Sequence, residues 1–147
     1  MKSSSRLSVA LHALAHLAEQ PDSPLSSGDL ARCVRTNPVV IRRTLAGLRD
    51  AGMVASTPGP GGGWTLARSA ERISIADVSA ALGERILLAV DLAGGPGCSI
   101  QKSVSHILDG FLDDAEALLQ KQLSRISLAD LAAQVRGKRT RTHVIPE

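Results

Sequence analysis

The sequence has very few aromatic residues: its 147 residues include one tryptophan, one phenylalanine and no tyrosine. Proteins that bind single-stranded nucleic acid stack the bases on aromatic side chains, and two aromatics cannot form such a platform. Cysteine is also scarce, since two residues are too few for the disulfide framework of a small secreted domain. Any nucleic-acid partner is therefore expected to be double-stranded, and both thiols are expected to be reduced.

Long hydrophobic runs are absent as well. No apolar segment approaches the roughly 18 residues that a membrane-spanning helix needs. The first residues, Met1 to Arg6, lead directly into an amphipathic stretch and lack the apolar core of a signal peptide. We therefore expect a cytoplasmic protein with no membrane partner, long enough for one compact domain and an appended element.

Positive charge is concentrated at the two ends of the chain. Residues 1–72 contain nine Lys and Arg against five Asp and Glu, residues 73–135 four against eight, and residues 136–147 four against one. The first region, and to a lesser extent the tail, suits a polyanion such as DNA. The acidic middle region is expected to face water or another protein.

The first two helices are predicted from apolar spacing and a capping signal. Leucine and alanine recur at helical spacing over about residues 5–19. Ser26, with Asp29 three positions later, matches a capping box that opens a short second helix ending near Val34.

A tight turn at Arg35 and Thr36 separates the second helix from a third. Asn37 is a good N-cap, and Pro38 suits the first helical position, where a missing N–H has no consequence. Gly52 suits a left-handed C-cap at the end of this helix. Two helices joined by a tight turn, the second opened by a strong cap, indicate a helix-turn-helix unit.

Two short strands are predicted next, at residues 53–56 and 64–66. The segment between them, residues 57–63, is so rich in Gly and Pro that it suits only a sharp hairpin tip, or wing. Ser74 then caps a fourth helix. The predicted fold is mainly α with a small β wing, in which residues 1–82 form a winged helix-turn-helix DNA-binding domain.

The longest apolar periodicity lies in residues 102–126, which would form a rod of roughly 37 Å as a helix. Because the preceding domain has its own core, this stripe is expected to pair with the same helix of a second copy. We expect residues 83–101 to form a linker or effector segment, 127–135 a last helix, and 136–147 a basic flexible tail. The predicted dimer-interface residues are Ile107, Leu108, Phe111, Leu112, Ala115, Leu118 and Leu119.

The third helix and the wing contain the residues that we expect to contact DNA. With its apolar positions turned to the core, the helix directs Arg42 and Arg43 outwards in the half that enters the major groove. Arginine there binds guanine O6 and N7 or holds a phosphate, whereas residues 35–37 are placed for phosphates. The alternative is that both arginines are only solvated surface charges. The predicted DNA-binding residues are Arg35, Thr36, Asn37, Val39, Arg42, Arg43, Gly59, Gly61, Gly62 and Gly63.

The glycine-rich segment does not match a nucleotide-binding loop. Residues 59–63 lack the Lys-Ser/Thr of a P-loop, and Trp64 occupies the position of the last glycine in G-x-G-x-x-G. Trp64 is instead expected to pack at the base of the wing. His12 and His16 are spaced to share a metal, but no third ligand follows at a suitable spacing. We predict no metal site and no enzymatic activity.

Several motifs recur along nearly the whole chain in a specific order. They are Arg6-Leu7, Leu45-x-x-Leu48-x-x-Ala51-Gly52-Met53-Val54, Gly59-Pro60-Gly61-Gly62-Gly63-Trp64-x-Leu66-Ala67, Ile73-x-Ile75-Ala76-Asp77-Val78 and Ser127-Leu128-Ala129-Asp130-Leu131. In these features the sequence resembles the Rrf-two (Rrf2) family of bacterial transcriptional regulators. The resemblance implies a homodimer on a palindromic operator, with the long helices crossing at the dimer interface.

The sequence departs from the cluster-binding members of that family, which carry three cysteines before the long helix. Residues 83–101 contain only Cys98, so three thiolates cannot be supplied and no iron–sulphur cluster is expected as a cofactor. The string from Asn37 to Arg43 and the single Cys98 resemble a cluster-free branch. Pro58 stands where cluster-type members often place an arginine, so wing readout by a basic side chain is not expected.

The two cysteines are interpreted differently. Cys98 lies near the start of the long helix, and a helix N-terminus favours a reactive thiolate, which makes it a candidate redox sensor. Cys33, beside Leu30 and Val34 on the second helix, is expected to be a core residue.

The predicted function is a homodimeric regulator of transcription, most simply a repressor, that responds to a thiol reagent or a ligand. One alternative is a winged helix that docks proteins, which would expose apolar residues where this chain places Arg42 and Arg43. Another is a redox enzyme that uses Cys98, which lacks a second cysteine nearby.

Overall fold

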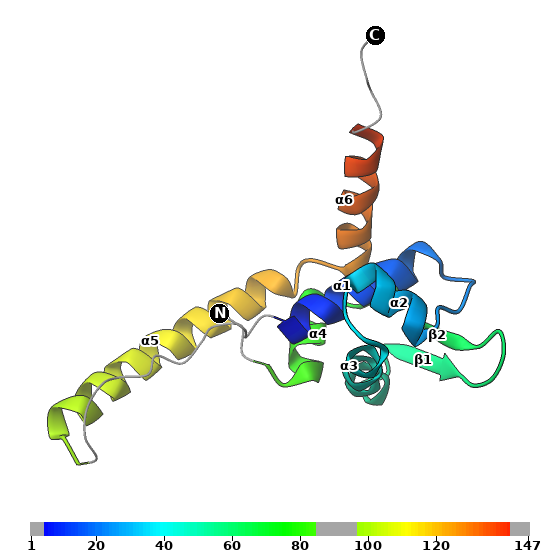
Figure 1. The fold of residues 1–147 in the computed structure, drawn as a ribbon. Helices are drawn as coiled ribbons and strands as arrows, with labels where there is room; N and C mark the ends of the chain where they lie inside the picture. The colour runs from blue at the N-terminus through cyan, green and yellow to red at the C-terminus, as the bar shows by residue number, and fades with distance from the viewer. Residues whose placement is uncertain (1–4, 85–96, 142–147) are drawn as a thin grey trace, which may run out of the picture.

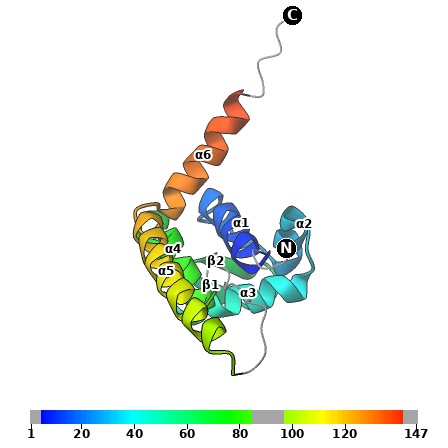
Figure 2. The ribbon, with the colours of Figure 1, turned by 90° about the vertical axis from the view of Figure 1, so that its left-hand side faces the viewer.

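The computed structural model describes residues 5–84 and 97–141, and the structural statements below concern these residues. In chain order they form α1 (Ser5–Glu19), α2 (Ser27–Val34), α3 (Pro38–Asp50), β1 (Val54–Thr57), β2 (Gly63–Leu66), a 3₁₀ turn η1 (Ala70–Arg72), α4 (Ile75–Leu82), α5 (Ser99–Leu123) and α6 (Leu128–Arg141). The first four α-helices and the two strands form a compact body, from which α5 projects as a long rod (Figure 1). In both views α6 leaves the body on the side away from α3 (Figures 1 and 2).

Local capping contacts define the helices of the N-terminal half as expected. The Ser26 hydroxyl accepts a hydrogen bond from the Asp29 backbone N–H at 3.0 Å, which opens α2. Asn37 Oδ1 accepts one from the Val40 N–H at 3.0 Å, with Pro38 at the first position of α3. Gly52 adopts a left-handed φ of 74° just after α3. The predicted helix-turn-helix unit is confirmed.

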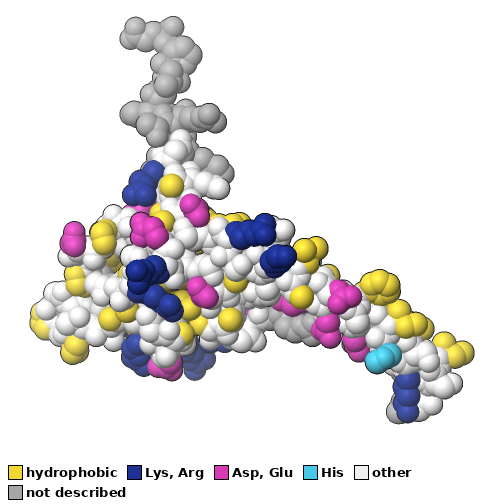
Figure 3. Space-filling model, turned by 180° about the vertical axis from the view of Figure 1, so that it is seen from behind, with side chains coloured by type: hydrophobic (Ala, Val, Ile, Leu, Met, Phe, Trp, Pro, Cys, Tyr) yellow, Lys and Arg dark blue, Asp and Glu magenta, His cyan; other side chains and the backbone are white. Residues whose placement is uncertain are grey.

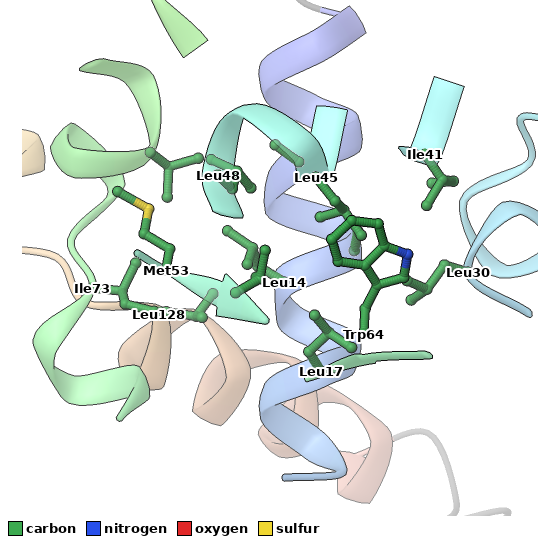
Figure 4. Packing of buried hydrophobic residues seen from close by; sticks show 14 of the residues in the cluster. Leu14, Leu17, Leu30, Ile41, Leu45, Leu48, Met53, Trp64, Ile73 and Leu128 are labelled. Atoms are coloured by element: carbon green, nitrogen blue, oxygen red, sulfur yellow. The ribbon is translucent and has the colours of Figure 1, made fainter. Parts of the chain in front are cut away.

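The core of the body is built from one face of each element. Figure 4 shows Leu14 and Leu17 of α1 facing Leu45 and Leu48 of α3, with the indole of Trp64 lying among them. Trp64 is 7% exposed. Its Nε1 donates a hydrogen bond to the Ser27 hydroxyl at 2.9 Å. Trp64 is therefore a packing residue at the base of the wing, as predicted.

The wing is an antiparallel hairpin in which Val54 pairs with Leu66 and Thr57 with Gly63. Backbone crowding explains the glycines at its tip. A Cβ on Gly62 would lie 2.2 Å from the Thr57 carbonyl oxygen. Only a residue without a side chain lets the chain turn this sharply. The wing that results lies beside α3 (Figure 1).

Backbone hydrogen bonds tie the connection between α5 and α6 to the body. The Leu128 N–H donates to the Ile73 carbonyl at 2.7 Å, and the Ile75 N–H donates to the Ile126 carbonyl at 3.0 Å. Ser127 caps α6 as expected, since its hydroxyl accepts a hydrogen bond from the Asp130 N–H at 3.1 Å. The C-terminal end of α5 is thereby fixed, and its N-terminal end projects.

The C-terminal elements differ in extent from the sequence-based expectation. The long helix spans Ser99–Leu123 rather than 102–126, and α6 continues to Arg141 instead of ending at Val135. Residues 136–141 of the predicted flexible tail are thus helical, because the one Gly137 among Lys and Arg weakens a helix by only about 1 kcal/mol. Most of the predicted linker, residues 85–96, and residues 142–147 lie outside the described residues.

The prediction that Cys33 is a core residue is wrong, because its side chain is exposed. The inner face of α2 is made by Leu30 and Ala31, which are both buried. Each helical residue is rotated about 100° from the one before it, so Cys33 lies on the flank of this face rather than beneath it.

Candidate nucleic-acid interface

The outer face of α3 presents one valine and two arginines. Ile41, Leu45 and Leu48 are fully buried, and they turn the opposite face of the helix to solvent. Val39, Arg42 and Arg43 are exposed on that face, at the i, i+3 and i+4 spacing that places side chains together. Their predicted outward orientation is confirmed.

The turn before α3 holds an arginine in an uncommon backbone conformation. Arg35 has φ 60° and ψ 51°, and it is the one non-glycine residue with positive φ within residues 5–84 and 97–141. The Thr36 N–H donates to the Ala31 carbonyl at 2.9 Å, which closes the end of α2. The turn therefore joins α2 to α3 and presents the exposed Arg35 side chain three residues before α3 begins.

Asn37 has its carbonyl oxygen occupied by the helix cap. The cap uses one of the two lone pairs of this oxygen, and the two Nδ2 donors can bind a phosphate oxygen. Asn37 is exposed just before α3, and the contact of residues 35–37 with the DNA backbone stays a prediction.

The wing tip offers backbone rather than side chains. Gly59 and Gly61 are exposed, with φ of 86° and 75°. Gly62 and Gly63 are partly buried, and a Cβ on Gly63 would lie 2.6 Å from the Leu25 carbonyl oxygen. The predicted wing glycines therefore divide into two that face solvent and two that close backbone contacts require, Gly62 within the hairpin and Gly63 against Leu25.

Sequence reasoning missed Arg68, which links the end of the wing to the residue after α3. Its Nη2 donates a hydrogen bond to the Ala51 carbonyl at 3.2 Å, just beyond the C-terminal end of α3. Cations are favourable at helix C-termini, and an arginine two residues after the second predicted strand could have suggested this contact. Arg68 is a positioning residue for the wing.

A cleft of about 560 Å³ lies between α1 and α3 and was also missed. The residues that line it are Arg6, Val9, Thr36, Val40, Arg43 and Thr44. Arg43 therefore borders the cleft, whereas Arg42 does not. The two adjacent arginines of α3 therefore have different surroundings.

The projecting helix α5 leaves a row of large apolar side chains in solvent. None of its residues is buried, and Phe111 is 66% and Ile100 74% exposed. Figure 3 shows hydrophobic side chains along this helix beyond the body. Of the predicted interface residues, Ile107, Phe111, Ala115 and Leu118 are exposed, while Leu108, Leu112 and Leu119 are partly exposed.

The thiols and histidines do not assemble a metal centre in the described part of the chain. Cys98 is exposed at the N-cap of α5, and Cys33 is exposed on α2. The rings of His12 and His16 stack with centroids 5.1 Å apart. Residues 5–84 and 97–141 contain no group of three or more His, Cys, Asp or Glu side chains that could hold a metal ion. No helix among them is long and apolar enough to cross a membrane.

A helix-turn-helix with a two-stranded wing beside it and arginines on its exposed helix defines a winged-helix protein. More specifically, the chain belongs to the Rrf2 family, whose model matches residues 3–134 and is described as an iron-dependent transcriptional regulator. The mainly helical winged fold and the family resemblance predicted from the sequence are both confirmed.

Several named proteins are similar to this chain. YwnA of Bacillus subtilis, named as an HTH-type transcriptional regulator, is 32% identical over 128 residues, which are 86% of this chain and 94% of YwnA. The regulator IscR of Vibrio atlanticus is 30% identical over 116 residues, 74% of this chain and 63% of IscR. A crystal structure of a transcriptional regulator from Lactobacillus plantarum matches with a TM-score of 0.72 and 25% identity, covering 89% of each chain.

Proposed function

We propose that this protein is a homodimeric, sequence-specific regulator of transcription that binds a palindromic operator in double-stranded DNA and acts as a repressor. The observation that carries the proposal is the outer face of α3, where Val39, Arg42 and Arg43 are exposed behind a firmly capped N-terminus. A helix of this kind, called a recognition helix, enters the major groove with its N-terminal half. A protein whose target is chromosomal DNA works in the cytoplasm.

The proposed dimer rests on the apolar row along α5. A monomeric protein rarely exposes so many large apolar side chains in one row, and a symmetric partner helix is the commonest way to cover them. Two copies place two recognition helices on the DNA, which accounts for a palindromic operator. Repression is the simplest outcome, because a dimer bound to its operator excludes RNA polymerase from a promoter that overlaps that operator.

The residues of this chain do not fit an iron–sulphur cluster, although the family description refers to iron. A cluster of this type takes four protein ligands, mainly thiolates, and the chain has two cysteines, one on α2 and one at the N-cap of α5. We therefore propose a regulator without a cluster and assign it no catalytic role. Cys98 is the proposed redox-sensing thiol, because it is exposed at the start of the projecting helix.

The test of DNA binding uses the full-length protein and its own upstream DNA over a salt series. We expect a site-specific shift that weakens steeply with salt, because arginines that contact phosphates displace counterions. Arg42→Ala or Arg43→Ala is expected to lose about 1–3 kcal/mol at the specific site if that arginine reads a base. Arg125→Ala is the matched control, because it also removes one positive charge but lies in the α5–α6 connection, away from α3.

The outcomes of this test are distinct. Unchanged operator affinity in both recognition-helix variants would contradict the assigned interface. A protein that selects no DNA site under any condition would support the alternative of a protein-docking winged helix. Loss of the shift with peroxide in the wild type, but not in Cys98→Ser, would establish the thiol switch, and equal loss in both would refute it.

A further inference from the structure

Val39 is an apolar residue on an otherwise basic surface. It is the second residue of α3 and is 48% exposed. Its neighbours turn elsewhere, since Val40 lines the cleft against α1 and Ile41 is fully buried. Val39 instead lies on the outer face of α3 with Arg42 and Arg43. It is at the N-terminal end of the helix, the end that enters the major groove in the proposed function.

The first turn of α3 has no other side chain suited to reading a base. Pro38 has no polar side-chain atom, Val40 lines the cleft and Ile41 is fully buried. The exposed side chain at this level of the outer face is therefore a valine. Its β-branched side chain has one strongly preferred rotamer in a helix, so its methyl groups are held in place before DNA binds.

The chemistry of the major groove leaves one partner for such a side chain. Adenine, guanine and cytosine present hydrogen-bonding groups there, whereas thymine also presents a C5 methyl group. Valine placed over polar groups would remove water from them without replacing the lost hydrogen bonds, at a cost in free energy. Valine placed over a thymine methyl buries two apolar groups against each other.

We propose that Val39 is a specificity-determining residue that requires a thymine methyl group at one position of each operator half-site. This inference rests on the proposed function, since it applies only if α3 enters the major groove of a specific site. It assigns a base preference to the first turn of α3 and leaves the guanine or phosphate contacts to the arginines.

The experiment removes the methyl group alone. The full-length protein first selects its preferred duplex from a random library, and each thymine of that duplex is then replaced in turn by uracil, which differs only at C5. At one thymine per half-site, uracil is expected to weaken wild-type binding about four-fold, which corresponds to ~0.8 kcal/mol for one buried carbon. All affinities are measured at one salt concentration.

The protein side of the test uses Val39→Ala. This variant is expected to bind the thymine duplex a few-fold more weakly and to distinguish thymine from uracil at that position less than the wild type does, because the alanine methyl covers less of the thymine methyl. Alanine has a higher helix propensity than valine and Val39 is exposed, so the fold is retained, as circular dichroism can verify. Val135→Ala, an exposed valine on α6, is the matched control and should keep the full four-fold effect.

Two results would overturn the inference while leaving the proposed function intact. In one, a specific duplex is selected but no uracil substitution weakens its binding. In the other, the uracil effect persists undiminished in Val39→Ala. Failure to select any duplex would instead contradict the proposed function itself, so the two failures can be told apart.

Discussion

The strongest quantitative prediction concerns Phe111 in the middle of α5. Its side chain is 66% exposed in one protomer, in the row of apolar residues that the proposed dimer covers. A phenylalanine side chain buries about 200 Å², so covering the exposed part would bury about 100 Å² more than an alanine would. At ~25 cal/mol/Å² this contributes about 2.5 kcal/mol for each protomer.

Phe111→Ala changes both protomers of a homodimer at once. The dimer is therefore expected to lose about 5 kcal/mol, which raises the dimer dissociation constant by roughly 10³- to 10⁴-fold. Because α5 contains no buried residue in a single protomer, the substitution should leave the fold of the body unchanged. Operator binding should weaken in parallel, since a monomer places only one recognition helix on the DNA.

Sedimentation equilibrium over a concentration series measures this effect directly. Lys102→Ala is the control, since Lys102 is exposed on the opposite face of the same helix and should leave the dissociation constant unchanged. An unchanged dissociation constant in Phe111→Ala, or a wild-type protein that stays monomeric at high micromolar concentration, would refute the assignment of the α5 row as the dimer interface.

Three further predictions concern local structure. Gly62→Ala is expected to distort the wing tip and to weaken DNA binding, because its Cβ would lie 2.2 Å from the Thr57 oxygen, and the loss should appear in the thermal melt and the operator shift. Gly110→Ala in α5 should instead stabilise the helix by about 1 kcal/mol, since nothing lies within 4 Å of the new Cβ, and a lower melting temperature would contradict this. Hydrogen bonds from the Ser127 backbone and side chain lower the pKa of Asp130 from 3.8. The Asp130 carboxylate therefore contributes to the free energy of unfolding above that pH, and this contribution is lost as the pH falls further. Melts of Asp130→Asn should accordingly be less sensitive to acid below about pH 4 than those of the wild type.

The parts of the fold that were predictable from the sequence depend on short-range contacts. Ser26, Asn37 and Ser74 each accept a hydrogen bond from a backbone N–H three residues later. Such contacts are encoded by neighbouring residue types, so the helix starts are visible without a structure. The outward direction of Arg42 and Arg43 follows equally from the period of one helix.

The parts that were missed depend on contacts between distant segments. The cleft between α1 and α3 and the hydrogen bond from Arg68 to Ala51 require knowledge of how the elements pack. The prediction that Cys33 is buried was wrong, because one apolar neighbour before it and one after it in the sequence do not decide which face of the helix is buried. The length of α6 was underestimated because the basic residues after Val135 were expected to form a flexible tail, whereas a helix can include them.

The backbone links at the base of α5 bear on how the proposed dimer would position its recognition helices. The connection after α5 is joined to the segment around α4 through Ile75–Ile126 and Ile73–Leu128, and α4 itself packs against α1 and α3. If two copies pair along α5, the crossing angle of these helices therefore determines the separation of the two α3 helices. Half-sites about 34 Å apart, or a multiple of that distance, are contacted together only at particular separations. A signal that altered the pairing along α5 would change operator affinity without touching any residue that contacts DNA, so the control of binding and the reading of sequence can reside in different helices.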